Sequence, residues 1–266
     1  MKSTDNELKY NEAIKYYNNK KYYQSLQLLE ELISIYKGSN RAEEVYYYYC
    51  MSYYGTGEYL TAAFHLNNFA KTYPASKHAE EAQFLNAYCY YLDSPIYSLD
   101  QKSTLDAIRQ FQLFINRYPQ SARLEECNRL IDELRLKLET KAYNNARLYY
   151  KMNEFRSAAV AFENVIKEFP STSYKEECLF LSVKASYLFA ENSIESKKTD
   201  RYKAAVEQYY KLIDAFPQSK YLREAERIFL DSQKQITKRE SENSVTLNRY
   251  INEHSGQKVE DESKFR

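Results

Sequence analysis

A ten-residue motif recurs along the chain and constrains its fold more than any other feature. It consists of an aromatic residue, a proline, a hydroxyl residue two positions later, an acidic pair or its remnant, and a small residue. The full copies are YPASKHAEEA from Tyr73, YPQSARLEEC from Tyr118, FPSTSYKEEC from Phe169 and FPQSKYLREA from Phe216; a degenerate copy, YKGSNRAEEV, begins at Tyr36. Proline ends a helix, a hydroxyl caps the next one, and acids favour its first turn. Each copy is therefore predicted to join two helices.

The segments between these junctions have helical periodicity. Apolar residues lie three and four positions apart in AFHLNNFAKTYP, AIRQFQLFINRYP, AVAFENVIKEFP and AVEQYYKLIDAFP. Only four glycines and five prolines are available for tight turns, which favours helices over hairpins. The sequence therefore predicts an all-α chain of about five helix pairs.

The proline positions of the motif are unevenly spaced, at residues 37 (Lys37 in the degenerate copy), 74, 119, 170 and 217. Two insertions account for part of the unevenness. Residues 93–103 are expected to lengthen the loop of the third helix pair, and residues 191–200 that of the fifth. Residues 124–138 have the pattern of an additional helix. The polar, aperiodic residues 237–266 are predicted to form a frayed helix and then a flexible tail.

The segment from Lys141 to Pro170 resembles the tetratricopeptide repeat family. The residues that fall where this family places its packing side chains are Ala146, Tyr149, Tyr150, Phe155, Ala158, Phe162 and Pro170. The resemblance implies that the helix pairs stack into a curved right-handed superhelix whose inner face forms a groove. We divide the chain into two sets of repeats. The N-terminal repeats, residues 1–118, are expected to hold a substrate groove. The C-terminal repeats, residues 119–236, are expected to dock a partner.

Helical phase separates the tyrosine-rich run from Tyr46 to Tyr54 into two stripes. Tyr46, Tyr49, Cys50 and Tyr53 share one face and coincide with the internal packing positions of the repeat. The second stripe lies on the face that lines the groove in repeat families of this type, and it recurs in the other repeats. In the N-terminal repeats, the predicted groove residues are Tyr10, Tyr17, Tyr47, Met51, Tyr54, Phe84, Tyr88 and Tyr91.

In the C-terminal repeats, the second stripe carries a cation between its aromatic residues. Its members are Tyr143, Arg147, Tyr150, Phe180, Lys184 and Tyr187. We expect the aromatic N-terminal rows to suit an extended peptide and the cationic rows to suit a folded, partly acidic partner. Any single ring of either set could instead pack against a neighbouring repeat, because tyrosine is common at these positions of the repeat.

Several chemistries find no support in the sequence. The net charge of +1 gives no field to gather nucleic acid, and no phosphate-binding loop or nucleophile motif occurs. The three histidines are far apart in sequence, so neither metal nor other cofactor is expected, and no catalytic residue is assigned. The acidic pairs are explained by helix starts, and the four cysteines by packing as free thiols, with disulfides left open. No apolar run is long enough to span a membrane.

Three segments resemble the BamD family, lipoprotein subunits of the outer-membrane β-barrel assembly machine. They are STDNELKY at the start of the first helix, YLDSP with the following LDQ in the first insertion, and KKTDRYKAAVEQYYKLI before the last proline. The YLDSP loop is similar to the version found in Bacteroidetes. The resemblance implies a non-catalytic scaffold at the periplasmic side of the outer membrane. It implies that the scaffold binds unfolded outer-membrane proteins through its N-terminal repeats and the periplasmic domains of BamA through its C-terminal repeats, with further lipoproteins as additional partners.

The start of the sequence departs from that family. Neither a signal peptide nor a lipidated cysteine precedes Lys2, so the chain is expected to be a trimmed form whose lipid anchor is missing. The alternative function is a cytosolic tetratricopeptide adaptor that binds a partner peptide. The lack of an export signal in the sequence favours this alternative.

Overall fold

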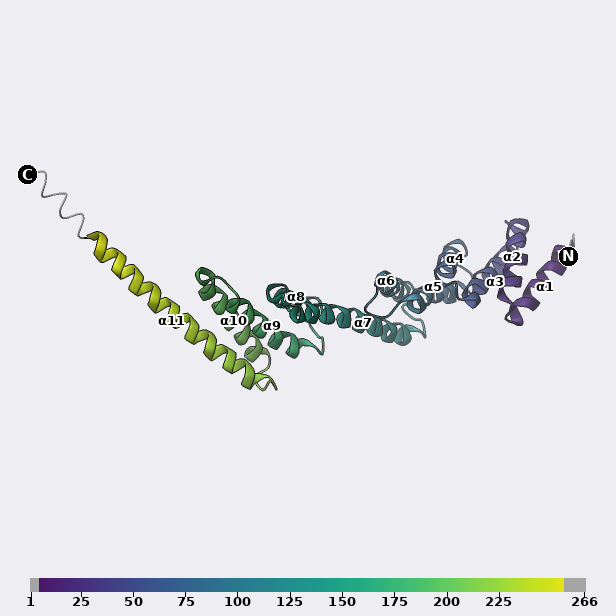
Figure 1. The fold of residues 1–266 in the computed structure, drawn as a ribbon. Coiled ribbons are helices and arrows are strands. Elements are labelled where there is room, and N and C mark those ends of the chain that lie inside the picture. The colour runs from purple at the N-terminus through teal and green to yellow at the C-terminus, as the bar shows by residue number, and fades with distance from the viewer. Residues whose placement is uncertain (1–4, 256–266) are drawn as a thin grey trace, which may run out of the picture. The chain divides into compact units, whose positions relative to one another are not determined.

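The computed structural model describes residues 5–255, and the side chains of residues 5–246. Within that range all regular secondary structure is helical, with no strand. The helices are α1 (Asn6–Asn18), α2 (Tyr22–Tyr36), α3 (Ala42–Thr56), α4 (Tyr59–Thr72), α5 (Ala79–Asp93), α6 (Lys102–Arg117), α7 (Leu124–Lys151), α8 (Phe155–Glu168), α9 (Lys175–Glu191), α10 (Glu195–Ala215) and α11 (Leu222–Ser255) (Figure 1). The predicted all-α fold of tetratricopeptide-like helix pairs is confirmed. The handedness and curvature of the stack stay predictions.

The chain forms two compact units, which divide between Leu138 and Glu139. In the first unit, successive helices from α1 to α6 contact one another. Its buried side chains form three clusters: one from α1, α2 and α3, one from α3, α4 and α5, and one from α5, α6 and the start of α7. Each of α3 and α5 thus contributes to two clusters, so a repeat completes its core only with the next repeat.

The second unit repeats this arrangement. One cluster joins the end of α7 to α8 and α9, and two more join α9 to α10 and α11. The helix α9 here plays the part that α3 and α5 play in the first unit. The division into a substrate half and a docking half at residue 118 was a functional one, and it stays a prediction.

The recurring motif ends one helix and delays the next by a short turn. At the second copy, α4 ends at Thr72, the Tyr73 N–H donates to the Phe69 carbonyl, and Pro74 follows. The Ser76 hydroxyl then accepts the N–H of His78, which is itself the N-cap residue of α5. The predicted hydroxyl N-cap is therefore wrong, because the serine stabilises a turn two residues before the helix cap.

The two insertions have different structures. The first forms the predicted loop between α5 and α6, where the buried Gln101 side chain donates to the carbonyls of Ile96 and Leu99. The second was predicted as a loop, and this is wrong for most of it, because α10 begins at Glu195. Glu195 pairs locally with Lys198 one turn later on α10, and it also pairs with Arg239, which is distant in sequence on α11; both contacts favour a helix there.

Two glycines shape the end of α3. Gly57 ends the helix with φ of 81°, a left-handed conformation that glycine adopts without strain. Gly55 lies under the ring of Tyr22, and a Cβ there would stand 2.6 Å from that ring. The missing side chain at residue 55 therefore lets α2 and α3 approach closely.

All four cysteines are buried and free, as the packing interpretation predicted. Cys50, Cys127 and Cys178 are completely enclosed in the small-residue positions of their helices. Burial raises the pKa of each thiol, to about 11 for Cys127 and to about 12 for Cys89 and Cys178.

The final helix is longer than the repeats predict. It continues through residue 255, so much of the segment predicted as frayed helix and tail is helical. The part of that prediction that falls on residues 256–266 lies outside the described residues.

Candidate functional site

We call the three members of the second stripe in one repeat a row. The first ring of each row, whether predicted for the groove or for docking, is part of a joint between repeats. The ring of Tyr47 stacks on His78 with centroids 3.9 Å apart, and its hydroxyl donates to Glu81 Oε2 at 2.9 Å. His78 immediately precedes α5, and Glu81 lies in the first turn of that helix. We call this arrangement a joint: an aromatic ring covered by the side chain that precedes the next odd-numbered helix.

The same joint occurs at every row of both units. In two pairs an arginine covers the ring, with Cζ of Arg41 5.0 Å from the centroid of Tyr10 and Cζ of Arg123 4.2 Å from that of Phe84. In the other two a tyrosine covers it, with ring centroids 4.2 Å apart for Tyr143 and Tyr174 and 4.4 Å apart for Phe180 and Tyr221. A planar or cationic side chain over a ring face is a favourable contact in each case. The alternative that such a ring packs between repeats is thus the correct one at these positions.

The acidic pairs are parts of the joints. Burial and a hydrogen bond to Glu44 raise the pKa of Tyr10, and burial and Glu177 do the same for Tyr143. Where the ring is a phenylalanine and has no hydroxyl, the acid has a cation as partner instead. Lys184 Nζ lies 2.8 Å from Glu224, beside Phe180.

The first acid of a pair has a different partner, the hydroxyl of the next motif copy. Ser76 donates to Glu43 at 2.6 Å, Ser121 to Glu80 at 2.6 Å and Ser219 to Glu176 at 2.7 Å. The acids do lie in the first turns of their helices, as predicted. Each of these serines belongs to the motif copy that follows the copy of its acid. This regular spacing was the signal in the sequence that could have shown the second role of the acids.

These joints show what covers the first ring of each predicted groove or docking row, while the assignment of the rows to a ligand or a partner stays a prediction. Tyr10, Phe84, Tyr143 and Phe180 are buried, and Tyr47 is half-buried under His78. One face of each ring is occupied by the covering side chain, so that face cannot also form the wall of a groove. Helical phase alone assigned them to the groove because it takes no account of what the next repeat places over them.

The later members of each row in the first unit keep more of their surface. Tyr17, Met51, Tyr54, Tyr88 and Tyr91 are all half-buried. Tyr88 stacks between Phe84 at 5.8 Å and Tyr91 at 5.5 Å, and Tyr54 lies against Tyr59 at 6.1 Å. Burial raises the pKa of Tyr54 to about 12. These side chains remain the candidate aromatic surface.

The predicted docking residues of the second unit are largely engaged within the unit. Lys184 is paired with Glu224, and the Tyr187 hydroxyl donates to Asp231 at 2.6 Å and Glu191 at 2.8 Å. Tyr150 is half-buried against Phe155, with centroids 5.8 Å apart. Arg147 is exposed over the Tyr143 ring and forms no ion pair with the described residues. It is therefore the cation of this set that a partner could reach.

The other stripe of the tyrosine run has the structural role that its phase predicted. Tyr49 and Cys50 are buried in two successive clusters. Tyr46, Tyr49 and Tyr53 surround His65, with ring centroids between 5.0 and 6.0 Å from the imidazole. Burial lowers the pKa of His65, which disfavours its charged form.

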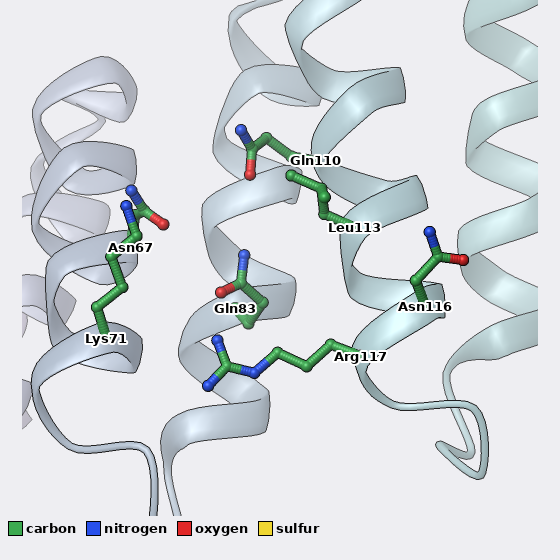
Figure 2. A pocket seen from close by; sticks show the side chains of 7 residues that line it. All are labelled: Asn67, Lys71, Gln83, Gln110, Leu113, Asn116 and Arg117. Atoms are coloured by element: carbon green, nitrogen blue, oxygen red, sulfur yellow. The ribbon is translucent and has the colours of Figure 1, made fainter.

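A polar pocket in the first unit lies outside the predicted rows. It has a volume of about 450 Å³ and lies among α4, α5 and α6 (Figure 2). The side chains that line it are Asn67, Lys71, Gln83, Gln110, Leu113, Asn116 and Arg117. In the sequence, this pocket is indicated only by polar residues at helix positions that face a neighbouring repeat. The helical phase of the aromatic residues, on which the site prediction was based, does not reveal them.

Neither a metal cluster nor a membrane-spanning helix is found in the described part of the chain. No group of three or more histidine, cysteine, aspartate and glutamate side chains there could hold a metal ion. None of its helices is long and apolar enough to cross a bilayer.

Comparison with known proteins identifies the family. Residues 1–201 match the YfiO family, described as outer membrane lipoproteins. The chain belongs to the YfiO family of outer membrane lipoproteins. This is the BamD-type family that the sequence segments resemble, and a role in outer-membrane protein assembly follows from membership of the YfiO family.

Two further comparisons add little. No curated protein matches the chain. A solved structure titled "TPR2AB-domain:pHSP90-complex of yeast Sti1" shares 14% sequence identity, with 93% of this chain and 96% of that chain covered and a TM-score of 0.40. A likeness of that size does not bear on function.

Proposed function

We propose that this chain is a non-catalytic receptor and scaffold at the periplasmic face of the outer membrane. Its first unit binds extended segments of unfolded outer-membrane proteins. Its second unit docks the periplasmic domains of BamA, and other lipoproteins of the assembly machine join it there. A lipid anchor at the N-terminus of the mature protein holds it to the membrane. Membership of the YfiO family supports this proposal over a cytosolic adaptor.

The observation that carries the substrate assignment is the row of half-buried aromatic side chains on α3 and α5. Tyr54, Tyr88 and Tyr91 each bury one part of the ring and leave another part exposed. A tyrosine held in this way loses little conformational entropy when a ligand covers it, and it offers both apolar area and a hydroxyl. An extended strand rich in aromatic side chains is the ligand that such a surface suits.

Removal of two such rings tests the substrate site. We expect the double variant Tyr54→Ala with Tyr88→Ala to bind an aromatic-rich strand peptide on the order of tenfold more weakly, because exposed aromatic anchors dominate interface energies. Tyr47 is not used here, since its loss would also break a joint. Binding is measured by fluorescence anisotropy, and the fold is checked by circular dichroism and thermal unfolding.

A matched control removes two tyrosines elsewhere in the same unit. Tyr23 and Tyr97 are exposed and lie outside the rows, so Tyr23→Ala with Tyr97→Ala should leave the affinity unchanged. Equal affinity of the wild type and a folded Tyr54→Ala, Tyr88→Ala variant would refute the substrate assignment.

Charge reversal at Arg147 tests the docking of BamA. Arg147→Glu replaces the accessible cation among the predicted docking residues with an anion, and we expect BamA no longer to co-purify from an outer-membrane extract. The control is Arg156→Glu, an exposed arginine on α8. Co-purification that is equal for both variants would contradict the docking assignment, and failure of the wild type to retain BamA would contradict the partner itself.

A further inference from the structure

The loop between α5 and α6 is held in place by a buried side chain. Gln101 is 6% exposed, and its side-chain amide donates to the carbonyl of Ile96 at 2.9 Å and to that of Leu99 at 3.0 Å. Its side-chain oxygen accepts the hydroxyl of Thr104 at 2.7 Å. Both the donor and the acceptor of this amide therefore hold the backbone of residues 96–99 against the start of α6.

Two further contacts hold the base of the same loop. Lys137 Nζ, on α7, donates to the Ser94 hydroxyl at 2.7 Å and to the Ser94 carbonyl at 3.3 Å. The Ser103 hydroxyl, on α6, donates to the carboxylate of Asp93 at the end of α5. Surface loops are usually mobile, whereas this one is restrained by side chains from three helices.

The restrained loop exposes large apolar side chains at its tip. Ile96 is 67% exposed and Leu99 is 56% exposed, and Tyr97 between them is also exposed. The Leu99 N–H donates to the Ile96 carbonyl at 3.1 Å, so the three side chains belong to one turn. A single exposed apolar residue is common, but a cluster of them held in one conformation marks an interaction site.

The tip of the loop carries no charge, and one cation lies beside it. Residues 95–99 contain no acidic or basic side chain. Asp100 accepts the backbone N–H of Lys102 at 3.0 Å. The side chain of Lys102 is exposed, and its ammonium forms no ion pair within residues 5–246. Aliphatic side chains, a tyrosine and a cation at the edge suit the boundary between lipid headgroups and acyl chains.

We propose that this loop inserts into the surface of a lipid bilayer. Ile96, Tyr97 and Leu99 enter the boundary between headgroups and acyl chains, and Lys102 contacts a lipid phosphate. The contact is additional to the lipid anchor. It rests on the membrane location in the proposed function, which membership of a family of outer membrane lipoproteins supports.

The size of the tip favours a bilayer over a protein as its ligand. A stable protein interface buries about 800 Å² on each partner, whereas one large aromatic side chain buries about 150–250 Å². Three side chains therefore supply only part of a protein interface. A bilayer needs no complementary pocket, and an anchor on the same chain raises the effective concentration, so a small apolar contact suffices.

A tryptophan placed at the tip reports insertion directly, because the chain has no tryptophan of its own. The full chain with Tyr97→Trp is held to vesicles by an N-terminal hexahistidine extension and a nickel-chelating lipid, which replace the anchor. The vesicles consist of phosphatidylethanolamine with a smaller share of phosphatidylglycerol. We expect a blue shift of the fluorescence and quenching by brominated acyl chains.

The matched control places the tryptophan elsewhere on the same unit. Tyr23 is exposed on α2, so the fluorescence of Tyr23→Trp should not respond to brominated lipid. Absence of quenching at position 97, or equal quenching at positions 97 and 23, would overturn the proposal. A blue shift at position 97 with the periplasmic domains of BamA, but not with vesicles, would identify a protein partner and would overturn it as well.

Variants of the tip test which side chains insert. In the Tyr97→Trp background, Ile96→Ser with Leu99→Ser should reduce the quenching about tenfold, because the apolar contact is lost. Leu60→Ser with Phe64→Ser removes exposed apolar side chains from α4 instead and should leave the quenching unchanged. Equal quenching in these two variants would overturn the proposal.

Charge reversal tests the contact with lipid phosphate. Lys102→Glu should reduce the quenching about fivefold in these anionic vesicles, whereas Lys37→Glu, at an exposed position directly after α2, should not change it. Equal quenching in the two variants would overturn the phosphate contact. Ile96→Ser with Leu99→Ser should bind the aromatic-rich strand peptide like the wild type and retain BamA, so a failure of this inference and a failure of the proposed function are distinguishable.

Discussion

The joint at Tyr47 in the first unit and the joint at Phe180 in the second have the same geometry but different chemistry. At Tyr47 the ring carries the donor, and its hydroxyl contacts Glu81. At Phe180 the ring carries none, and Lys184, one turn later, supplies the donor to Glu224. In both joints the glutamate in the first turn of the next odd-numbered helix has a donor as partner. The donor is the ring residue itself in the first unit, and it is the residue one turn after the ring in the second. Four predictions test how far the two joints are equivalent.

Removal of a joint ring should have the largest effect. Phe180 is 4% exposed and stacks on Tyr221, so Phe180→Ala should lower the free energy of unfolding by about 3–5 kcal/mol. Urea unfolding measures the change. Phe64→Ala is the control, because this phenylalanine is 60% exposed and its loss should cost less than about 0.5 kcal/mol. Losses of similar size at both positions would mean that the joint contributes nothing beyond an ordinary surface ring.

Loss of the motif hydroxyl should come next. Ser76 donates to Glu43 and accepts the N–H of His78, so Ser76→Ala should cost about 1–2 kcal/mol of unfolding free energy. Ser157 is exposed on α8, and Ser157→Ala should be neutral or slightly stabilising. The same denaturant titration compares both. No loss in Ser76→Ala would leave the hydroxyl with no stabilising role in the joint.

Tyr47→Phe converts the first joint toward the second without a compensating cation. At neutral pH it should cost about 1 kcal/mol for the lost hydrogen bond to Glu81. Burial and that carboxylate raise the pKa of Tyr47, so in the wild type its contribution is complete below the unfolded-state pKa of about 10 and is lost as pH rises toward the folded-state pKa. The stability difference between wild type and variant should therefore shrink above pH of about 10. A difference that is constant up to strongly alkaline pH would contradict this sign.

Removal of the charge from the second joint should have the smallest effect. Both side chains of the Lys184–Glu224 pair are partly exposed, so Glu224→Gln should cost less than about 1 kcal/mol. Added salt should reduce the difference further, because it screens exposed charges. The effect of Tyr47→Phe, which removes a neutral donor, should depend less on salt. Unfolding measured at low and high salt compares them, and a larger salt dependence for Tyr47→Phe would reverse the comparison.

The fold could be predicted from local signals. Helix ends, apolar periodicity and the recurring motif are properties of short segments, and they located the helix pairs and the first insertion. The second insertion was predicted wrongly because contacts from Arg239, far along the chain, stabilise the helix there. The hydroxyl cap was wrong because a serine can stabilise either a cap or the turn before it, and the sequence is the same for both.

The candidate site was less predictable than the fold. Helical phase correctly separated Tyr49 and Cys50 from the second stripe. It could not separate Tyr47, which His78 covers, from Tyr54, because the covering side chain belongs to another repeat. The pocket at Gln83 depends on three helices at once. Contacts between repeats therefore decide which residues of a repeat can meet a ligand.

The enclosed cysteines have a consequence for redox chemistry. Only the thiolate forms disulfides readily, and burial holds the pKa of Cys89 and Cys178 at about 12 and that of Cys127 at about 11. Burial also raises the pKa of Cys50. In an oxidising compartment, the folded chain would keep its thiols protonated and out of reach of oxidants, whereas the unfolded chain would expose four reactive groups. Resistance to oxidation is thus a property of the fold, and exposure of any one thiol would report that its repeat has opened.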